Sequence, residues 1–450
     1  MYRDTPIQPR SGSGSASGKG NPQVLRNGLT NAAGPQAGRD LSGPVRRMAA
    51  VAWRAGLGLL LIALSSCQPM TSRPTPTPTA TATATPTMTP LPTATATATA
   101  TTTPTATPTA TASPTATPKP SPTPLPQAWS LSPMSFEWQD WNNCGVVSLE
   151  MVLSYYGVKR GQYEIAASLK PHKDDKHVSP EELLAYAAQY GLKGGVYVNG
   201  DPERLQALVG AGIPVLIQTW LNDRPTGHYR VVRGYDRQAG TLLFNDSYYG
   251  PQVKMTLAAV EKVWAPFNHC YIPIYRPEKE ATVRRILGPD WDAATMYRRA
   301  ASAARQWTQD KPADPYAWFS LGDDLLGLGD AQGALEAYAK AEAIGLPEHM
   351  YWYRFGPFEA LLASQQYDKL LAKSGAVLAT LSAIEELHML RGQAYEALGQ
   401  NDKAIEEYQL AFTYHTNYTP AVQALQRLGG AIPPTPTITP TPQPTAAKTG

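Results

Sequence analysis

A stretch of Thr, Pro and Ala residues limits how much of this 450-residue chain can fold. It runs from residue 71 to about residue 126 and contains almost no large apolar side chains. Such a segment cannot repay the entropy cost of ordering, so we expect it to stay extended and solvated. The tail at 433–445 repeats this composition, and residues 1–47 are rich in Gly, Ser, Asn and Arg. The part that can fold therefore runs from about 128 to about 430.

An apolar segment, MAAVAWRAGLGLLLIALSSC at 48–67, precedes the Thr/Pro-rich stretch. Its apolar core at 55–64 is too short to cross a bilayer, which needs about 20 residues. A short core with arginines beside it is typical of a secretory signal. The segment ends in LSSC, which resembles the lipobox of bacterial lipoproteins.

The lipobox resemblance implies that Cys67 carries a lipid and becomes the mature N-terminus, anchored in the cell membrane and facing outside. Residues 68–127 then form a disordered stalk, and residues 431–450 form a disordered tail. Because Met48 begins a complete signal, we expect residues 1–47 to be disordered or to come from a mis-called start. The alternative is an ordinary signal anchor with a chance cysteine.

The formal net charge of +3 is small for a chain of this length. No block of Lys and Arg alternates with aromatic residues, the pattern that contacts nucleic acid. We therefore expect no nucleic-acid partner.

Cys144 is one of three cysteines and stands directly before an apolar run, 145–156, that ends at Gly157. This run predicts a buried helix of about three turns. The positive end of a helix dipole favours the thiolate, which is the nucleophilic form of cysteine. The alternative is a small buried cysteine at the start of a core helix. Cys270 lies in CYIPIY and is expected in a buried strand.

A nucleophilic cysteine needs a base and a group that orients the base. His228 begins a β-rich run at 228–235, and a second run at 241–246 follows a short turn, which predicts a hairpin. The other histidines look less suitable. His172 and His177 flank KDDK in a polar stretch, which favours an exposed loop over a metal site.

The register of the predicted hairpin decides whether Asp246 can serve as the orienting group. If Tyr235 pairs with Thr241, Asp246 lies opposite Arg230, two residues from His228. Partners and second neighbours share one face of a sheet, so the two side chains can hydrogen-bond. A slip of one residue would place them on opposite faces.

Gln139, five residues before Cys144, can donate a side-chain amide hydrogen bond to a tetrahedral oxyanion. Other residues flank the proposed catalytic group in sequence and are candidates for substrate contact, although the aromatic ones suit a core equally well. These are Trp141, Asn143, Gly145 and Tyr248.

The segments WQDWNNCGVVSLEMVLSYYG (138–157), GHYRVVRGYD (227–236) and FNDSYYGP (244–251) resemble family thirty-nine of the cysteine peptidases. Members are papain-like domains best known for trimming double-glycine leaders from bacteriocin precursors. The resemblance covers about 128–275 and implies an α+β papain-like domain over 128–280.

The family resemblance also implies a role for each of four residues. They are the oxyanion donor Gln139, the nucleophile Cys144, the base His228 and the orienting Asp246. One departure is Val146-Val147, which stands where a proline and a small residue are expected. Within this domain we also expect helices at 179–192 and 201–212 and a buried strand at 214–220.

The C-terminal part, 290–430, is helical in composition and repeats with a period near 35 residues. Gly322, Gly356 and Gly392 are spaced by 34 and 36, and small and large residues alternate around the first and the last. This pattern resembles the tetratricopeptide repeat, with a degraded middle copy at 348–382. The resemblance implies an all-α array whose concave groove binds a peptide or protein partner. The alternative is a structural spacer.

Together these patterns predict an exported, membrane-tethered cysteine peptidase that needs neither a cofactor nor a metal ion. It would hydrolyse peptides or proteins, and the repeats would bind the substrate or a partner protein. Two alternatives remain: a catalytically inactive scaffold, and an acyltransferase or amidase that uses the same thiol.

Overall fold

A computed structural model of the chain describes residues 125–222 and 224–435, which belong to one compact unit. The expectations for Cys67, for the signal at 48–67 and for residues 1–47 lie outside this part, as do nearly all of the stalk and most of the tail. Within the described ranges, no helix is both long and apolar enough to cross a membrane.

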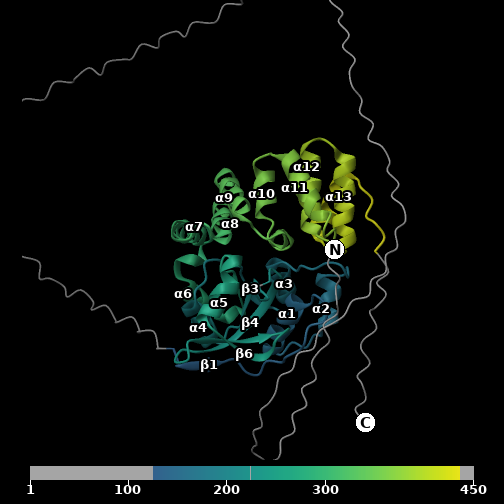
Figure 1. The fold of residues 1–450 in the computed structure, drawn as a ribbon. Coiled ribbons are helices and arrows are strands. Elements are labelled where there is room, and N and C mark those ends of the chain that lie inside the picture. The colour runs from purple at the N-terminus through teal and green to yellow at the C-terminus, as the bar shows by residue number, and fades with distance from the viewer. Residues whose placement is uncertain (1–124, 223, 436–450) are drawn as a thin grey trace, which may run out of the picture. The chain divides into compact units, whose positions relative to one another are not determined.

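An antiparallel sheet forms the centre of the N-terminal half of the described chain (Figure 1). Its strand order is β2-β7-β3-β4-β5-β6, and β1 pairs with β4. Every residue of β3 is buried, as expected for a central strand with both faces covered. The strands are β1 Ala128–Ser130, β2 Lys193–Gly194, β3 Val215–Trp220, β4 Gly227–Asp236, β5 Thr241–Asp246, β6 Gly250–Thr256 and β7 Tyr271–Tyr275.

The β4–β5 hairpin differs from the expected register at the turn and agrees with it at the far end. The turn closes with Asp236 opposite Thr241, one residue beyond the expected Tyr235. A bulge between Val232 and Gly234 then shifts the pairing, because one extra residue lies on β4. Beyond the bulge Val231 pairs with Asn245, so Asp246 comes next to Arg230 as expected.

Six helices accompany this sheet, and α1 packs against β4. Most of α1 is buried, including both valines of Val146-Val147, and the helix begins at Cys144. The helix expected at 179–192 is present as α3, which ends earlier, at Ala188, and begins with a capping box between Ser179 and Glu182. The helices are α1 Cys144–Tyr155, α2 Gln162–Leu169, α3 Pro180–Ala188, α4 Pro202–Gly210, α5 Leu257–Trp264 and α6 Glu280–Leu287.

The C-terminal part is helical, as expected, and neighbouring helices pack as consecutive pairs (Figure 1). A Cβ added to Gly322 would lie 2.4 Å from the ring of Tyr338, and one added to Gly392 would lie 2.3 Å from the ring of Tyr408. Glycine therefore allows the same close helix contact in two copies. The helices are α7 Ala293–Asp310, α8 Pro315–Gly327, α9 Ala331–Ile344, α10 Gly356–Ala363, α11 Tyr367–Leu378, α12 Glu385–Ala397, α13 Asn401–Tyr414 and α14 Thr419–Leu428.

Short 3-10 turns link several of these elements. One of them, η4, leads into Tyr353, a residue of the helical part that packs against Trp220 and Phe267 of the sheet part. Close by, Asn268 donates a 2.6 Å hydrogen bond to Asp324 of α8. The 3-10 turns are η1 Ala265–Phe267, η2 Pro277–Lys279, η3 Gly288–Trp291 and η4 Glu348–Trp352.

Candidate active site

Cys144 is the first residue of α1, so its thiol lies at the positive end of the helix dipole. Hydrogen bonds from α2 hold the loop that precedes it. Oε1 of Gln162 accepts from the backbone of Asp140 at 2.9 Å and from the side chain of Asn143 at 3.1 Å. Nζ of Lys170 donates to the carbonyl of Asn142 at 2.9 Å. These bonds hold the backbone that leads into Cys144.

His228 on β4 and Asp246 at the end of β5 are hydrogen-bonded, with 2.9 Å between Nε2 and Oδ1. The same Oδ1 accepts from the backbone N–H groups of Tyr248 and Tyr249 at 2.9 and 3.0 Å. Oδ2 accepts from Nε of Arg230 at 2.7 Å. These donors fix the orientation of the Asp246 carboxylate, and the carboxylate fixes the orientation of the His228 ring.

Because Nε2 of His228 faces Asp246, Nδ1 is the ring nitrogen left for the thiol of Cys144, which lines the same cavity. Burial opposes ionisation of the thiol, but the hydrogen bond and charge of His228 outweigh it and lower the pKa of Cys144. Burial likewise opposes protonation of His228, but the charge and hydrogen bond of Asp246 raise its pKa. Both shifts favour a thiolate–imidazolium pair.

Asp246 stays ionised although it is fully buried. Burial would raise its pKa, but the charges and hydrogen bonds of His228 and Arg230 hold that pKa well below the usual range. Arg230 is itself only 2% exposed and donates to the carbonyls of Trp220 at 2.9 Å and Leu221 at 2.6 Å. A buried carboxylate with this many donors can support a charged imidazole beside it.

Gln139 lies in the loop before α1 and is tied to the residue after Asp246. Its Oε1 accepts from the hydroxyl of Ser247 at 2.9 Å, and its backbone N–H donates to the carbonyl of Ser247 at 3.0 Å. The hydroxyl of Ser247 fixes the orientation of the Gln139 amide, and the NH₂ group of that amide is left to donate to another acceptor.

The four residues expected to contact substrate have different surroundings. Trp141 and Tyr248 are 62% and 38% exposed. Asn143 is buried and hydrogen-bonded to Gln162. Gly145 lies in the wall of the cavity beside Cys144, but a Cβ there would point at the ring of Tyr229, 3.1 Å away. The small size of Gly145 therefore serves packing within the protein, a reason that sequence reasoning missed.

The cavity beside Cys144 and His228 also contains residues that sequence reasoning did not select. His177 was expected to be exposed, but it is only 7% exposed and lies in the cavity wall with Lys176. The expectation was wrong because the polar residues of KDDK, beside His177 in sequence, indicated an exposed loop. Tyr353, from the helical part, closes another side of the cavity. No sequence signal linked so distant a residue to Cys144.

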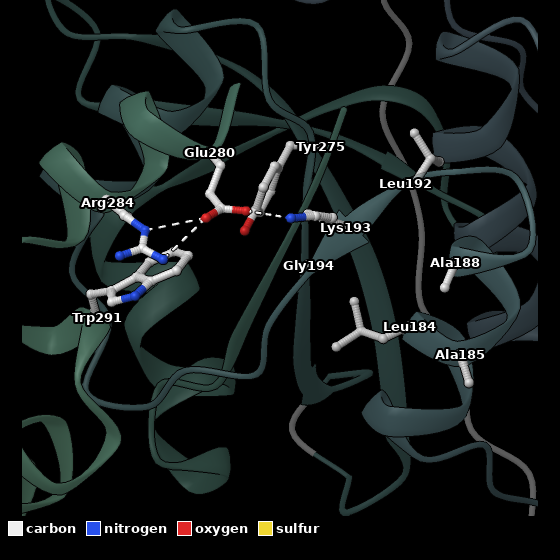
Figure 2. A pocket seen from close by; sticks show the side chains of 10 residues that line it. All are labelled: Leu184, Ala185, Ala188, Leu192, Lys193, Gly194, Tyr275, Glu280, Arg284 and Trp291. Atoms are coloured by element: carbon white, nitrogen blue, oxygen red, sulfur yellow. Dashed lines mark hydrogen bonds and ion pairs between the residues drawn. The ribbon is translucent and has the colours of Figure 1, made fainter. Parts of the chain in front are cut away.

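A larger cavity, of about 600 Å³, lies elsewhere, and its ten lining residues include no cysteine or histidine (Figure 2). Its charged groups are paired: Glu280 accepts from Lys193 at 2.6 Å and from Arg284 at 3.1 Å. Trp291 stacks against Arg284. Its lining therefore offers no nucleophile for the chemistry expected at Cys144.

Residues 129–272, about a third of the chain, match the family model described as "Peptidase_C39 like family". This match contains Cys144, His228 and Asp246, and it supports the resemblance noted from the sequence. A comparison with curated proteins found no match.

Among solved structures, a double glycine motif protease from an AMS/PCAT transporter, in complex with the leader peptide, is 20% identical. Its match covers 33% of this chain and 94% of that one, with a TM-score of 0.27. The peptidase domain of Streptococcus ComA is 17% identical, with coverages of 32% and 98% and a TM-score of 0.27. The fragment of MamA from Desulfovibrio magneticus RS-1 that runs from residue 41 to the end is 24% identical. Its match covers 31% of this chain and 94% of that one, with a TM-score of 0.25.

Asp246→Asn tests the electrostatic account of the site. Removing the carboxylate charge should lower the pKa of His228 and raise that of Cys144, so less thiolate is present in mild acid. We expect alkylation of Cys144 by iodoacetamide at about pH 6 to slow by roughly tenfold or more, as one pKa unit implies. Peptide mapping of the labelled thiol measures the rate.

Cys270 provides an internal control in the same labelling experiment. Burial raises its pKa to about 12, so it should stay unlabelled in both proteins. An unchanged alkylation rate at Cys144 would contradict the role given to Asp246, provided that the melting temperature shows the variant to be folded.

Proposed function

We propose that the domain expected at 128–280 is a cysteine peptidase that hydrolyses peptide bonds. The observation that carries this proposal is the ordered chain from Arg230 through Asp246 and His228 to a thiol at a helix N-terminus. A buried cysteine that only fills space needs none of these partners. The family match at 129–272 supports the same class of chemistry.

In the proposed reaction, the thiolate of Cys144 attacks the carbonyl carbon of the scissile peptide bond. The backbone N–H of Cys144 and the side-chain NH₂ of Gln139 stabilise the oxyanion. The C–N bond then breaks, and the imidazolium of His228 gives its proton to the leaving amine. A water molecule, deprotonated by His228, attacks the thioester and releases the carboxylic acid together with the thiolate.

We also propose that the helical part is a tetratricopeptide-like array that takes part in binding substrate or a partner protein. The glycine–tyrosine contacts repeated in two copies support the array. Tyr353 supports a link to the active site, because its ring packs against Gly227, next to His228, where an added Cβ would lie 2.7 Å from that ring. The helical part thereby contributes a wall of the catalytic cavity.

Substitution of the nucleophile or the base tests the peptidase directly. Cys144→Ala and His228→Ala should each reduce cleavage of a mixed peptide library by at least about a thousandfold, because each removes a group that reacts. Asp246→Ala should cause a smaller loss. Mass spectrometry of the library detects cleavage.

Cys270→Ala is the matched control, since it removes a buried thiol that lies outside the site, and it should retain cleavage. Normal cleavage by folded Cys144→Ala would refute the proposal. If the protein transferred the peptide acyl group to an added amine without hydrolysis, its activity would be acyl transfer and the proposed peptidase activity would be wrong.

Lipid attachment at Cys67 remains a proposal that rests on the sequence LSSC. We expect Cys67→Ala to move the protein from the membrane fraction to the soluble fraction, because a lipidated cysteine would be the anchor. Immunoblotting of fractionated cells measures this change. An unchanged distribution would contradict the anchor.

A further inference from the structure

Two carboxylates and a histidine converge where the helical part meets the sheet part. Glu182 comes from α3, Glu385 is the first residue of α12, and His415 follows α13. One ligand atom from each lies within 4.8 Å of the other two. Nδ1 of His415 is 3.0 Å from Oε1 of Glu182 and 3.2 Å from Oε1 of Glu385. The chemistry proposed for Cys144 uses none of these groups.

His415 is only 4% exposed, and its Nδ1 and the Oε1 of Glu182 are buried atoms without a hydrogen-bond partner among the described residues. The other ring nitrogen, Nε2, lies 3.2 Å from the carbonyl of Ser168. A ring that donates from Nε2 to this carbonyl presents the lone pair of Nδ1 to the two carboxylates. Lone pairs that converge in this way are suited to a cation between them.

The outer contacts resemble those that orient metal ligands. A ligating histidine usually donates its other ring N–H to a carbonyl, and ligating carboxylates are themselves hydrogen-bonded. Oε2 of Glu182 accepts from the backbone and the hydroxyl of Ser179, both at 2.8 Å, which turns Oε1 towards His415. Ser168 and Ser179 therefore hold two of the three ligands in place.

The charge around the cluster also favours a cation. Asp175 is fully buried, with an Oδ2 atom that has no hydrogen-bond partner among the described residues, and Glu386 lies beside Glu385 in sequence. Lys170 is the nearby cation that acts on Asp175. Buried carboxylates in excess of cations are costly unless a further positive charge balances them.

We propose that Glu182, Glu385 and His415 bind a divalent transition-metal ion, zinc by preference. In a tetrahedral zinc site with bonds of about 2.0 Å, ligand atoms lie roughly 3.3 Å apart, close to the two distances seen here. The imidazole disfavours Mg²⁺ and Ca²⁺, which prefer oxygen ligands alone. Water would complete the coordination.

The proposed ion links the two parts of the chain and lies near the catalytic loop. Glu182 belongs to the sheet part, whereas Glu385 and His415 belong to the helical part, so one ion would bind both. The charge of Glu385 acts on Lys170, which donates to the carbonyl of Asn142 beside the nucleophile. The role proposed is structural, and it does not depend on peptidase activity.

The test uses the full chain without an affinity tag. We expect one zinc ion per chain by elemental mass spectrometry after dialysis against zinc. Removal of zinc with a chelator should lower the melting temperature by several degrees, and zinc alone should restore it. Glu385→Gln and His415→Asn should weaken zinc binding by more than about a hundredfold. Glu385→Gln keeps the size of the side chain and so limits damage to the fold.

A second histidine provides a matched control. His388 on α12 is also buried, with Nδ1 2.7 Å from Glu407 and Nε2 3.0 Å from a backbone carbonyl. There Arg391 binds the same carboxylate at 2.7 Å and supplies the balancing charge. His388→Asn should therefore leave the zinc content unchanged.

Two results would overturn the metal site. A wild-type chain that keeps no zinc after dialysis, and whose melting temperature zinc does not change, would show that a protonated His415 alone bridges the carboxylates. Equal zinc binding by wild type and by folded Glu385→Gln and His415→Asn would place the ion elsewhere.

Discussion

The buried contact between Arg230 and Asp246 is the interaction on which the candidate active site depends. Together with the charge and hydrogen bond of His228, it keeps Asp246 ionised inside the protein, and the charge of Asp246 raises the pKa of His228. His228 in turn lowers the pKa of Cys144. Because β4 and β5 carry the first three residues and α1 carries the fourth, the pairing of two strands and the packing of one helix bring the site together.

The helical part contributes to this site instead of lying apart from it. Tyr353 closes the cavity beside Cys144, and His177 reaches the same cavity from a loop next to α3. The residues proposed to bind zinc also join the two parts: Glu182 lies on α3, Glu385 begins α12 and His415 follows α13. The helical part therefore contributes a wall of the cavity that contains Cys144 and His228.

Local patterns in the sequence predicted much of this fold, because they depend on near neighbours. The apolar run after Cys144 predicted α1, and the helix expected at 179–192 is present as α3. The predicted hairpin placed Asp246 near His228 although its turn was one residue out, since the bulge between Val232 and Gly234 restored the pairing. Burial of His177 and the approach of Tyr353 could not be predicted, because both arise from contacts between segments far apart in the chain.

The electrostatics of the site favour a thiolate at Cys144 paired with a protonated His228. Ultraviolet absorbance of the thiolate across pH, taken as the difference between wild type and Cys144→Ser, tests it most directly. The account predicts a titration below the ordinary range of cysteine, which moves up in His228→Ala. A titration within or above that range, with no response to His228→Ala, would contradict the pair and leave the thiol a packing residue.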